Sequence, residues 1–134
     1  MNNLEKIFKN IILIHFFLFI ATAIWELFLV NEETMDLASQ LGDTEMFSNT
    51  YFIVFAIVTL ILYLLNLFFL YKFYAFSKNL FLILLILFYV QSLFSGLILF
   101  EPFGYILDDL VTLSQGAILT LLFLTPLKER FLNT

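Results

Sequence analysis

The residues of this chain that could do chemistry lie inside long apolar segments. His15, Thr22 and Glu26 are spaced so that all three fall on one face of a helix. An imidazole can titrate near neutral pH and a carboxylate can bind a hard cation, so such a face can pass protons or hold an ion. Polar groups are costly in a bilayer and usually face protein. The spacing therefore predicts an inward-facing polar stripe.

Each of the other three apolar segments also carries polar residues at helical spacing. Together with the first stripe they form a predicted interior polar seam, whose further members are Thr59, Asn66, Gln91, Ser95, Thr112 and Gln115. The helical rise puts His15 near the level of Asn66, and Gln91 and Gln115 near the midplane. We expect the two glutamines to face each other or a shared interior site. Small residues predicted to let helices approach closely are Ser92, Gly96, Gly116 and Thr120.

Two interpretations of the interior polar seam remain open. In the first, its hydrogen bonds join helices, because lipid provides no hydrophobic drive between them. In the second, the seam is a cation or proton path from Glu26 to His15. The midplane carries no charged residue, and the chain contains 19 phenylalanines that leave little room for water. Both observations favour the first interpretation.

Carboxylates gather where the predicted helices reach the outer surface. A cluster of several carboxylates can bind a divalent cation such as calcium. The candidate residues for this outer cation cluster are Glu26, Glu101, Asp108 and Asp109. Outward-facing carboxylates also follow from the charge asymmetry of the chain, and Glu26 can simply reach water from the end of its helix.

Enzyme chemistry has little support in the sequence. The single histidine excludes a multi-histidine metal site, and the lack of cysteine excludes thiolate ligands and cysteine nucleophiles. No glycine-rich phosphate loop or nucleophile elbow occurs. We therefore expect no catalytic residue and no cofactor, and no metal site other than the outer cluster.

The composition identifies the environment of these residues. Of 134 residues, 63% are hydrophobic and 13% are charged. Soluble domains are about 45–50% apolar and about 25% charged. A net charge of −5 argues against nucleic acid as a partner. The sequence predicts an integral membrane protein.

Four apolar segments are long enough to span a bilayer as helices, at residues 11–30, 51–71, 80–100 and 105–124. They predict an all-α fold, a four-helix antiparallel transmembrane bundle forming a single membrane domain over residues 1–134. The outer loop, residues 31–50, is predicted to form a short helix after Thr34 that rests on the membrane or docks a partner.

The basic residues set the predicted orientation. All six lie on one side of the predicted spans: Lys6, Lys9, Lys72, Lys78, Lys128 and Arg130. Positive residues stay on the cytoplasmic side, so both termini are predicted to be cytoplasmic in a multi-pass inner, cytoplasmic-type membrane.

These features predict a small membrane protein that acts non-catalytically through helix–helix contacts, as a subunit of a membrane complex or as an immunity or assembly factor. Its expected partners are the lipid bilayer and another membrane protein or a second copy of the chain. The alternative is an oligomeric ion or proton channel or transporter that uses the seam from Glu26 to His15.

Overall fold

The computed structural model describes residues 3–25, 28, 36, 50–94 and 102–131. Within these ranges the structure contains helices and turns and no strand. Four helices are long and apolar enough to cross a membrane, which confirms the prediction of four such helices. They are α1 (Asn3–Ile24), α3 (Thr50–Tyr71), α4 (Ala75–Phe94) and α5 (Pro102–Leu124), followed by the 3-10 helix η2 (Pro126–Phe131). The helix predicted after Thr34 falls almost entirely outside the described residues.

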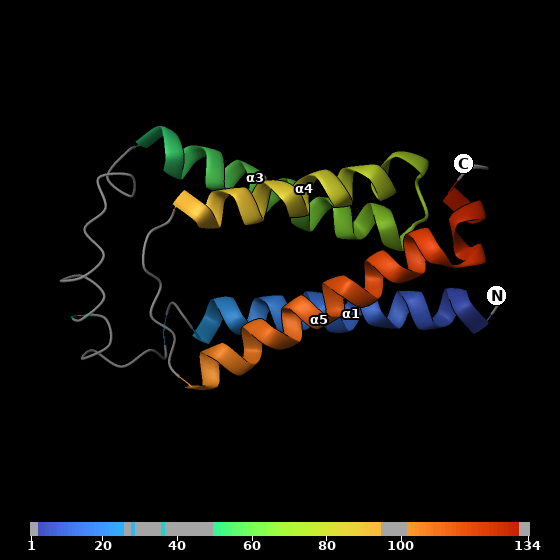
Figure 1. The fold of residues 1–134 in the computed structure, drawn as a ribbon, viewed down its shortest axis with the longest axis horizontal. Helices are drawn as coiled ribbons and strands as arrows, with labels where there is room; N and C mark the ends of the chain where they lie inside the picture. Colours follow the sequence, from blue (N-terminus) through green and yellow to red (C-terminus); the bar gives the residue numbers. More distant parts are fainter. Residues whose placement is uncertain (1–2, 26–27, 29–35, 37–49, 95–101, 132–134) are drawn as a thin grey trace.

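The helices associate as two pairs (Figure 1). Helix α1 packs chiefly against α5, and α3 packs chiefly against α4. The two pairs meet through α1 and α3, while η2 lies against the end of α5 and also contacts α4. A short turn joins α3 to α4, and the two helices pack side by side. Helix α5, in contrast, lies against the first helix of the chain rather than mainly against α4, which precedes it.

Helix α1 begins well before the predicted start of the first span. It includes the polar segment from Asn3 to Lys9, and Glu5 in its first turn is favourable for the helix dipole. Phe8 is fully buried, which ties this extension to the core. His15 consequently lies about 18 Å from the start of α1, near the middle of the helix, at about 1.5 Å per residue.

The turn between α3 and α4 ends α3 with a Schellman motif. The Phe73 N–H donates to the Leu70 carbonyl at 3.0 Å, and the Tyr74 N–H donates to the Phe69 carbonyl at 3.1 Å. Phe73 has a φ of 62°, at the position where glycine is usual. A left-handed conformation costs a residue with a side chain about 1–2 kcal/mol. The aromatic ring of Phe73 is nevertheless held in the core.

The terminal aromatic cluster consists of Phe8, Phe73 and Phe131, from α1, the α3–α4 turn and η2. The ring centroids of Phe8 and Phe73 are 5.7 Å apart, and Phe131 lies 5.9 Å from Phe8 and 5.3 Å from Phe73. Each ring is at least nine-tenths buried. The cluster therefore joins three separate parts of the chain at the end where the termini meet (Figure 1).

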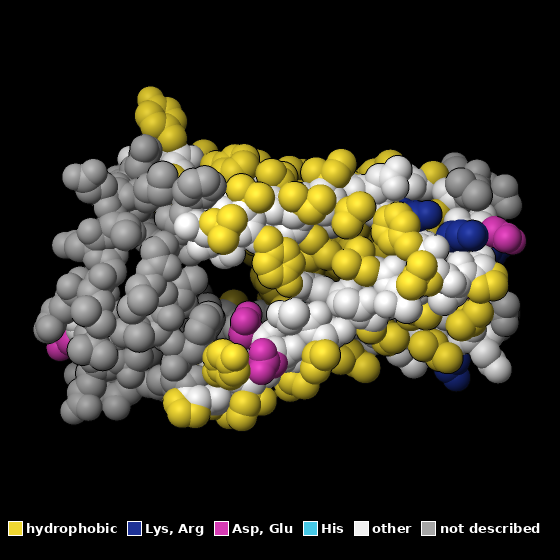
Figure 2. Space-filling model, in the orientation of Figure 1, with side chains coloured by type: hydrophobic (Ala, Val, Ile, Leu, Met, Phe, Trp, Pro, Cys, Tyr) yellow, Lys and Arg dark blue, Asp and Glu magenta, His cyan; other side chains and the backbone are white. Residues whose placement is uncertain are grey.

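Helix η2 reaches this cluster because α5 stops before Pro126. The Thr125 hydroxyl donates to the Leu121 carbonyl at 2.7 Å and accepts from the Leu127 N–H at 3.2 Å. The chain then turns back across the end of the helices, where Arg130 forms an ion pair with Glu5 at 2.8 Å. Figure 2 shows the Lys and Arg side chains of the visible face at this same end.

Candidate functional site

His15 is the centre of a hydrogen-bond network that joins three helices. The imidazole is fully buried, and both of its nitrogens have partners. Nδ1 lies 2.7 Å from the Ser114 hydroxyl of α5, and Nε2 lies 2.6 Å from the Tyr63 hydroxyl of α3. Gln115 of α5 donates from Nε2 to the same Tyr63 oxygen at 3.3 Å. His15, Tyr63, Ser114 and Gln115 form the interior network.

The hydrogens of the interior network run in one direction. Ser114 donates its hydroxyl hydrogen to the Val111 carbonyl at 2.7 Å, so it accepts at the His15 side. Tyr63 accepts from Gln115 and retains one hydrogen, which it donates to Nε2 of His15. The network thus assigns the imidazole as neutral with its hydrogen on Nδ1, the arrangement in which the hydrogens of His15, Tyr63 and Ser114 all have acceptors.

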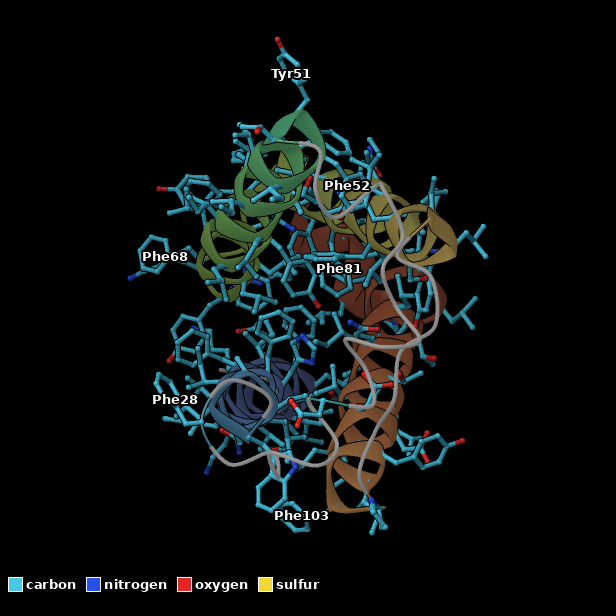
Figure 3. All side chains as sticks on the ribbon, turned by 90° about the vertical axis from the view of Figure 1, so that its left-hand side faces the viewer. Phe28, Tyr51, Phe52, Phe68, Phe81 and Phe103 are labelled. Atoms are coloured by element: carbon cyan, nitrogen blue, oxygen red, sulfur yellow. The ribbon has the colours of Figure 1, made fainter. Side chains whose placement is uncertain are left out.

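Aromatic rings enclose the interior network. Tyr63 is fully buried, and its ring packs 5.6 Å from Phe19, 5.7 Å from Phe81 and 5.1 Å from Phe88. Figure 3 shows Phe81 pointing in between the helices. At the edge of the network, the Tyr89 hydroxyl of α4 donates to Gln115 Oε1 at 3.2 Å. All four long helices are therefore connected through one set of polar side chains packed among aromatic rings.

The remaining buried polar residues form separate contacts. Gln91 donates to the Thr59 hydroxyl at 3.3 Å, linking α4 to α3. Asn66 is fully buried and donates to the Ser77 carbonyl at 3.1 Å, while its own side-chain oxygen has no partner. Thr22 is buried and donates to the Leu18 carbonyl within α1. The residues predicted as one seam thus occupy several distinct places along the helices.

The depth of His15 differs from the sequence prediction. Because α1 starts at Asn3, His15 meets Tyr63, about one helical turn deeper than Asn66. The predicted meeting of Gln91 and Gln115 is also replaced by other partners. Gln91 bonds Thr59, and Gln115 connects Tyr63 with Tyr89.

Part of the predicted α5 stripe points outward. Gln115 is half-buried, but Thr112 is exposed. The prediction that Thr112 lies in the interior seam is therefore wrong for this chain. Apolar residues occupy the inner face of α5 instead, and Val111 on that face lies one position before Thr112. The buried residues of this helix are Gly104, Leu107, Val111, Ile118 and Leu122.

The described members of the predicted helix-packing set do not face the interior either. Ser92, Gly116 and Thr120 are exposed on the surfaces of α4 and α5. The Thr120 hydroxyl bonds the Gly116 carbonyl within its own helix at 2.9 Å. An added Cβ at Gly116 would meet no atom within 4 Å. No helix of the described chain therefore packs closely on Gly116.

Several predicted site residues lie outside the described part of the chain, namely Glu26, Ser95, Gly96 and Glu101. Asp108 and Asp109, the described half of the outer cation cluster, are both exposed on α5. Among the described residues, no three histidine, aspartate or glutamate side chains gather closely enough to hold a metal ion. The outer cation cluster stays a prediction.

Sequence reasoning missed Tyr63, Tyr89 and Ser114. Tyr63 follows Thr59 by four residues and precedes Asn66 by three, so helical spacing alone puts it on the same face as these two. Tyr63 was counted as an apolar residue of the span, so its hydroxyl was not considered as a hydrogen-bonding group. Ser114 directly precedes Gln115 in the sequence. It was missed because the inner face of α5 was predicted one position too late along the helix.

Comparison of the chain with protein-family models, curated proteins and solved structures finds no match. The functional conclusion therefore depends on the geometry alone. That geometry consists of a network of neutral polar groups centred on the buried His15 and Tyr63, and of small and polar residues on the outer face of α5.

Proposed function

We propose that the chain is an integral membrane protein that acts non-catalytically, through helix–helix contacts with another membrane protein or with a second copy of itself. In this proposal the four long helices form an antiparallel bundle. The apolar helices and their pairing support such a bundle. A role as a subunit of a membrane complex, or as an immunity or assembly factor, requires only such contacts.

The observation that carries this proposal is the outer face of α5. Thr112, Gly116 and Thr120 are exposed and follow one another at every fourth position, on the side away from the buried stripe. Glycine in a helix costs about 1 kcal/mol relative to alanine, and no described contact within the chain requires Gly116. Small residues at this spacing let membrane helices approach closely. A helix from another molecule accounts for them.

A bulky side chain on this face tests the proposal. Gly116 is exposed and a Cβ added there meets no atom of the described chain within 4 Å, so the isolated Gly116→Leu protein should fold as before. Its assembly, measured by native mass spectrometry after extraction in mild detergent, should be lost or strongly reduced. Gly116→Ala keeps the face small and should retain assembly. Ala21→Leu adds bulk to an exposed position on α1 and should also retain it. Equal assembly of Gly116→Leu and the unaltered chain would contradict the proposal.

The proposed orientation puts both termini in the cytoplasm of a cell with an inner, cytoplasmic-type membrane. It is supported by the basic residues at the end of the helices where the N- and C-terminal segments meet (Figures 1 and 2). A fluorescent protein that folds only in the cytoplasm should give signal when fused after Thr134. A phosphatase active only outside the cytoplasm should be silent at the same position, and the reverse pattern would overturn the orientation.

The alternative is an oligomeric proton or ion channel or transporter. One observation favours it, because Gln115, Tyr63, His15 and Ser114 are continuously hydrogen-bonded. Full burial of His15 and Tyr63 among aromatic rings favours the structural role instead. The alternative would be established if the unaltered protein carried protons or cations into liposomes and the His15→Gln variant folded normally but carried none.

A further inference from the structure

An apolar groove of about 360 Å³ runs along the surface between α1 and α3. Its floor contains Ile12 and Leu67, both buried, and Phe16 and Phe68 form part of its walls. Figure 3 shows Phe68 on the outer side of α3, pointing away from the centre of the molecule. The groove ends at Tyr71 and Lys72, where α3 meets the turn to α4.

Two ammonium groups lie at this end of the groove. Lys9 Nζ is 4.9 Å from the centre of the Tyr71 ring, and Lys72 Nζ is 5.8 Å from the centre of the Phe68 ring. Tyr71 and Phe68 both line the groove, and no acidic residue does. The ion pair found among the described residues joins Glu5 to Arg130 and includes neither lysine. The groove therefore has an apolar length and a positive end.

We propose that this groove binds an anionic phospholipid, with one acyl chain along α1 and α3 and the phosphate at Lys9 and Lys72. From Leu64 to Lys72 the groove follows α3 for about 12 Å, enough to hold a long stretch of acyl chain. Basic pockets between membrane helices on the cytoplasmic side suit anionic headgroups. A zwitterionic lipid would bring its own ammonium group toward the two lysines, so the anionic lipid is preferred.

The walls of the groove favour a lipid over a helix. Close helix contacts in membranes use small residues, whereas this groove is lined by Phe16, Phe68 and leucines. A flexible acyl chain can follow such an uneven surface. The inference goes beyond the proposed function, because lipid binding between α1 and α3 and helix contact on the outer face of α5 use different surfaces.

The test uses the full chain in nanodiscs that contain equal parts of phosphatidylglycerol and phosphatidylcholine. Native mass spectrometry of the released protein should show retained phosphatidylglycerol in excess over phosphatidylcholine. The double variant Lys9→Gln/Lys72→Gln should weaken this retention by roughly thirtyfold, the factor that two lysines near an anionic surface contribute. Lys128→Gln, at an exposed basic position of η2 that does not line the groove, should leave retention unchanged.

A second variant tests the acyl chain. Leu13 lines the groove and is 44% exposed, so Leu13→Trp should narrow the groove without disturbing the core. It should reduce phosphatidylglycerol retention with both lysines present, and inorganic phosphate alone should not stabilise the unaltered protein. Equal retention of the two lipids, or no effect of the double variant, would overturn the proposal. So would a change of oligomeric state in Leu13→Trp with unchanged lipid retention, which would identify a helix as the occupant.

Discussion

The terminal aromatic cluster and the interior network join helices by different kinds of contact. In the cluster, Phe8 meets Phe73 and Phe131 ring against ring, without a hydrogen bond between them. In the interior network, His15 bonds Tyr63 and Ser114 through both ring nitrogens. Phe8 and His15 are seven residues apart on the same face of α1, so one helix stripe serves both regions.

The difference between the two regions predicts which kind of contact contributes more to stability. All three rings of the cluster lie outside the four predicted spans, so their burial removes apolar surface from water as well as filling volume. Hydrogen bonds between membrane helices average only about 0.6 kcal/mol, because a separated helix also finds partners. Loss of volume in the cluster should therefore cost more than loss of a hydroxyl in the network.

The largest expected effect is that of Phe8→Ala. Removal of a fully buried ring leaves a cavity among Phe73, Phe131 and their neighbours, and should lower the free energy of unfolding by about 3 kcal/mol. Reversible unfolding in mixed detergent would measure it. Phe17→Ala, on the same helix but 67% exposed, should lower the free energy of unfolding by only a small fraction of the Phe8→Ala loss. Similar losses for both variants would show that the cluster is not a packed core.

The next effect concerns the backbone of the cluster. At most helical positions alanine is more stable than glycine, but Phe73 has a φ of 62°. Phe73→Ala loses the ring and keeps the strain, whereas Phe73→Gly loses the ring and removes the strain. Phe73→Gly should therefore be the more stable variant by about 1–2 kcal/mol. If Phe73→Ala were instead more stable than Phe73→Gly, the backbone of this turn would not be left-handed at Phe73.

A hydroxyl in the interior network should matter less. Tyr63→Phe keeps the ring among Phe19, Phe81 and Phe88 but removes the partner of His15 and Gln115. We expect a loss of about 1 kcal/mol in the free energy of unfolding. Tyr89→Phe removes a hydrogen bond at an exposed position and should cost less. A loss above that of Phe8→Ala would reverse the comparison between the two regions.

The sequence predicted the presence of the helices better than it predicted where they end and which parts of the chain they contact. Uninterrupted apolar runs define four helices, but helix ends depend on contacts far along the chain. Asn3 starts α1 eight residues before the predicted span, in a segment where Phe8 packs against residues of the α3–α4 turn and η2. Apolarity alone gives no information about such contacts.

The candidate site shows a similar limit. Helical spacing correctly indicates which residues share a face, and buried Thr59 and Asn66 share theirs with Tyr63. It does not indicate which face turns inward when nearly every face is apolar. On α5 the inner face consists of aliphatic side chains next to Ser114, and Thr112 and Gly116 were left outside.

The smallest expected effect is that of the ion pair beside the terminal aromatic cluster. Arg130 is largely exposed and Glu5 is largely buried, and their side chains meet at 2.8 Å. Surface ion pairs contribute about 0.2–1 kcal/mol, so Arg130→Gln should lower stability by about 0.5 kcal/mol. Glu5→Gln should cost slightly more, because it also removes a negative charge from the first turn of α1, where the helix dipole favours one. Both losses should shrink in high salt, which screens exposed charges.

A double-mutant cycle in low and high salt measures the pair itself, with Lys128→Gln as the control for the loss of one positive charge on η2. A coupling energy that does not change with salt would mean that the contact holds η2 by packing rather than by charge, and would make η2 an extension of the aromatic cluster alone.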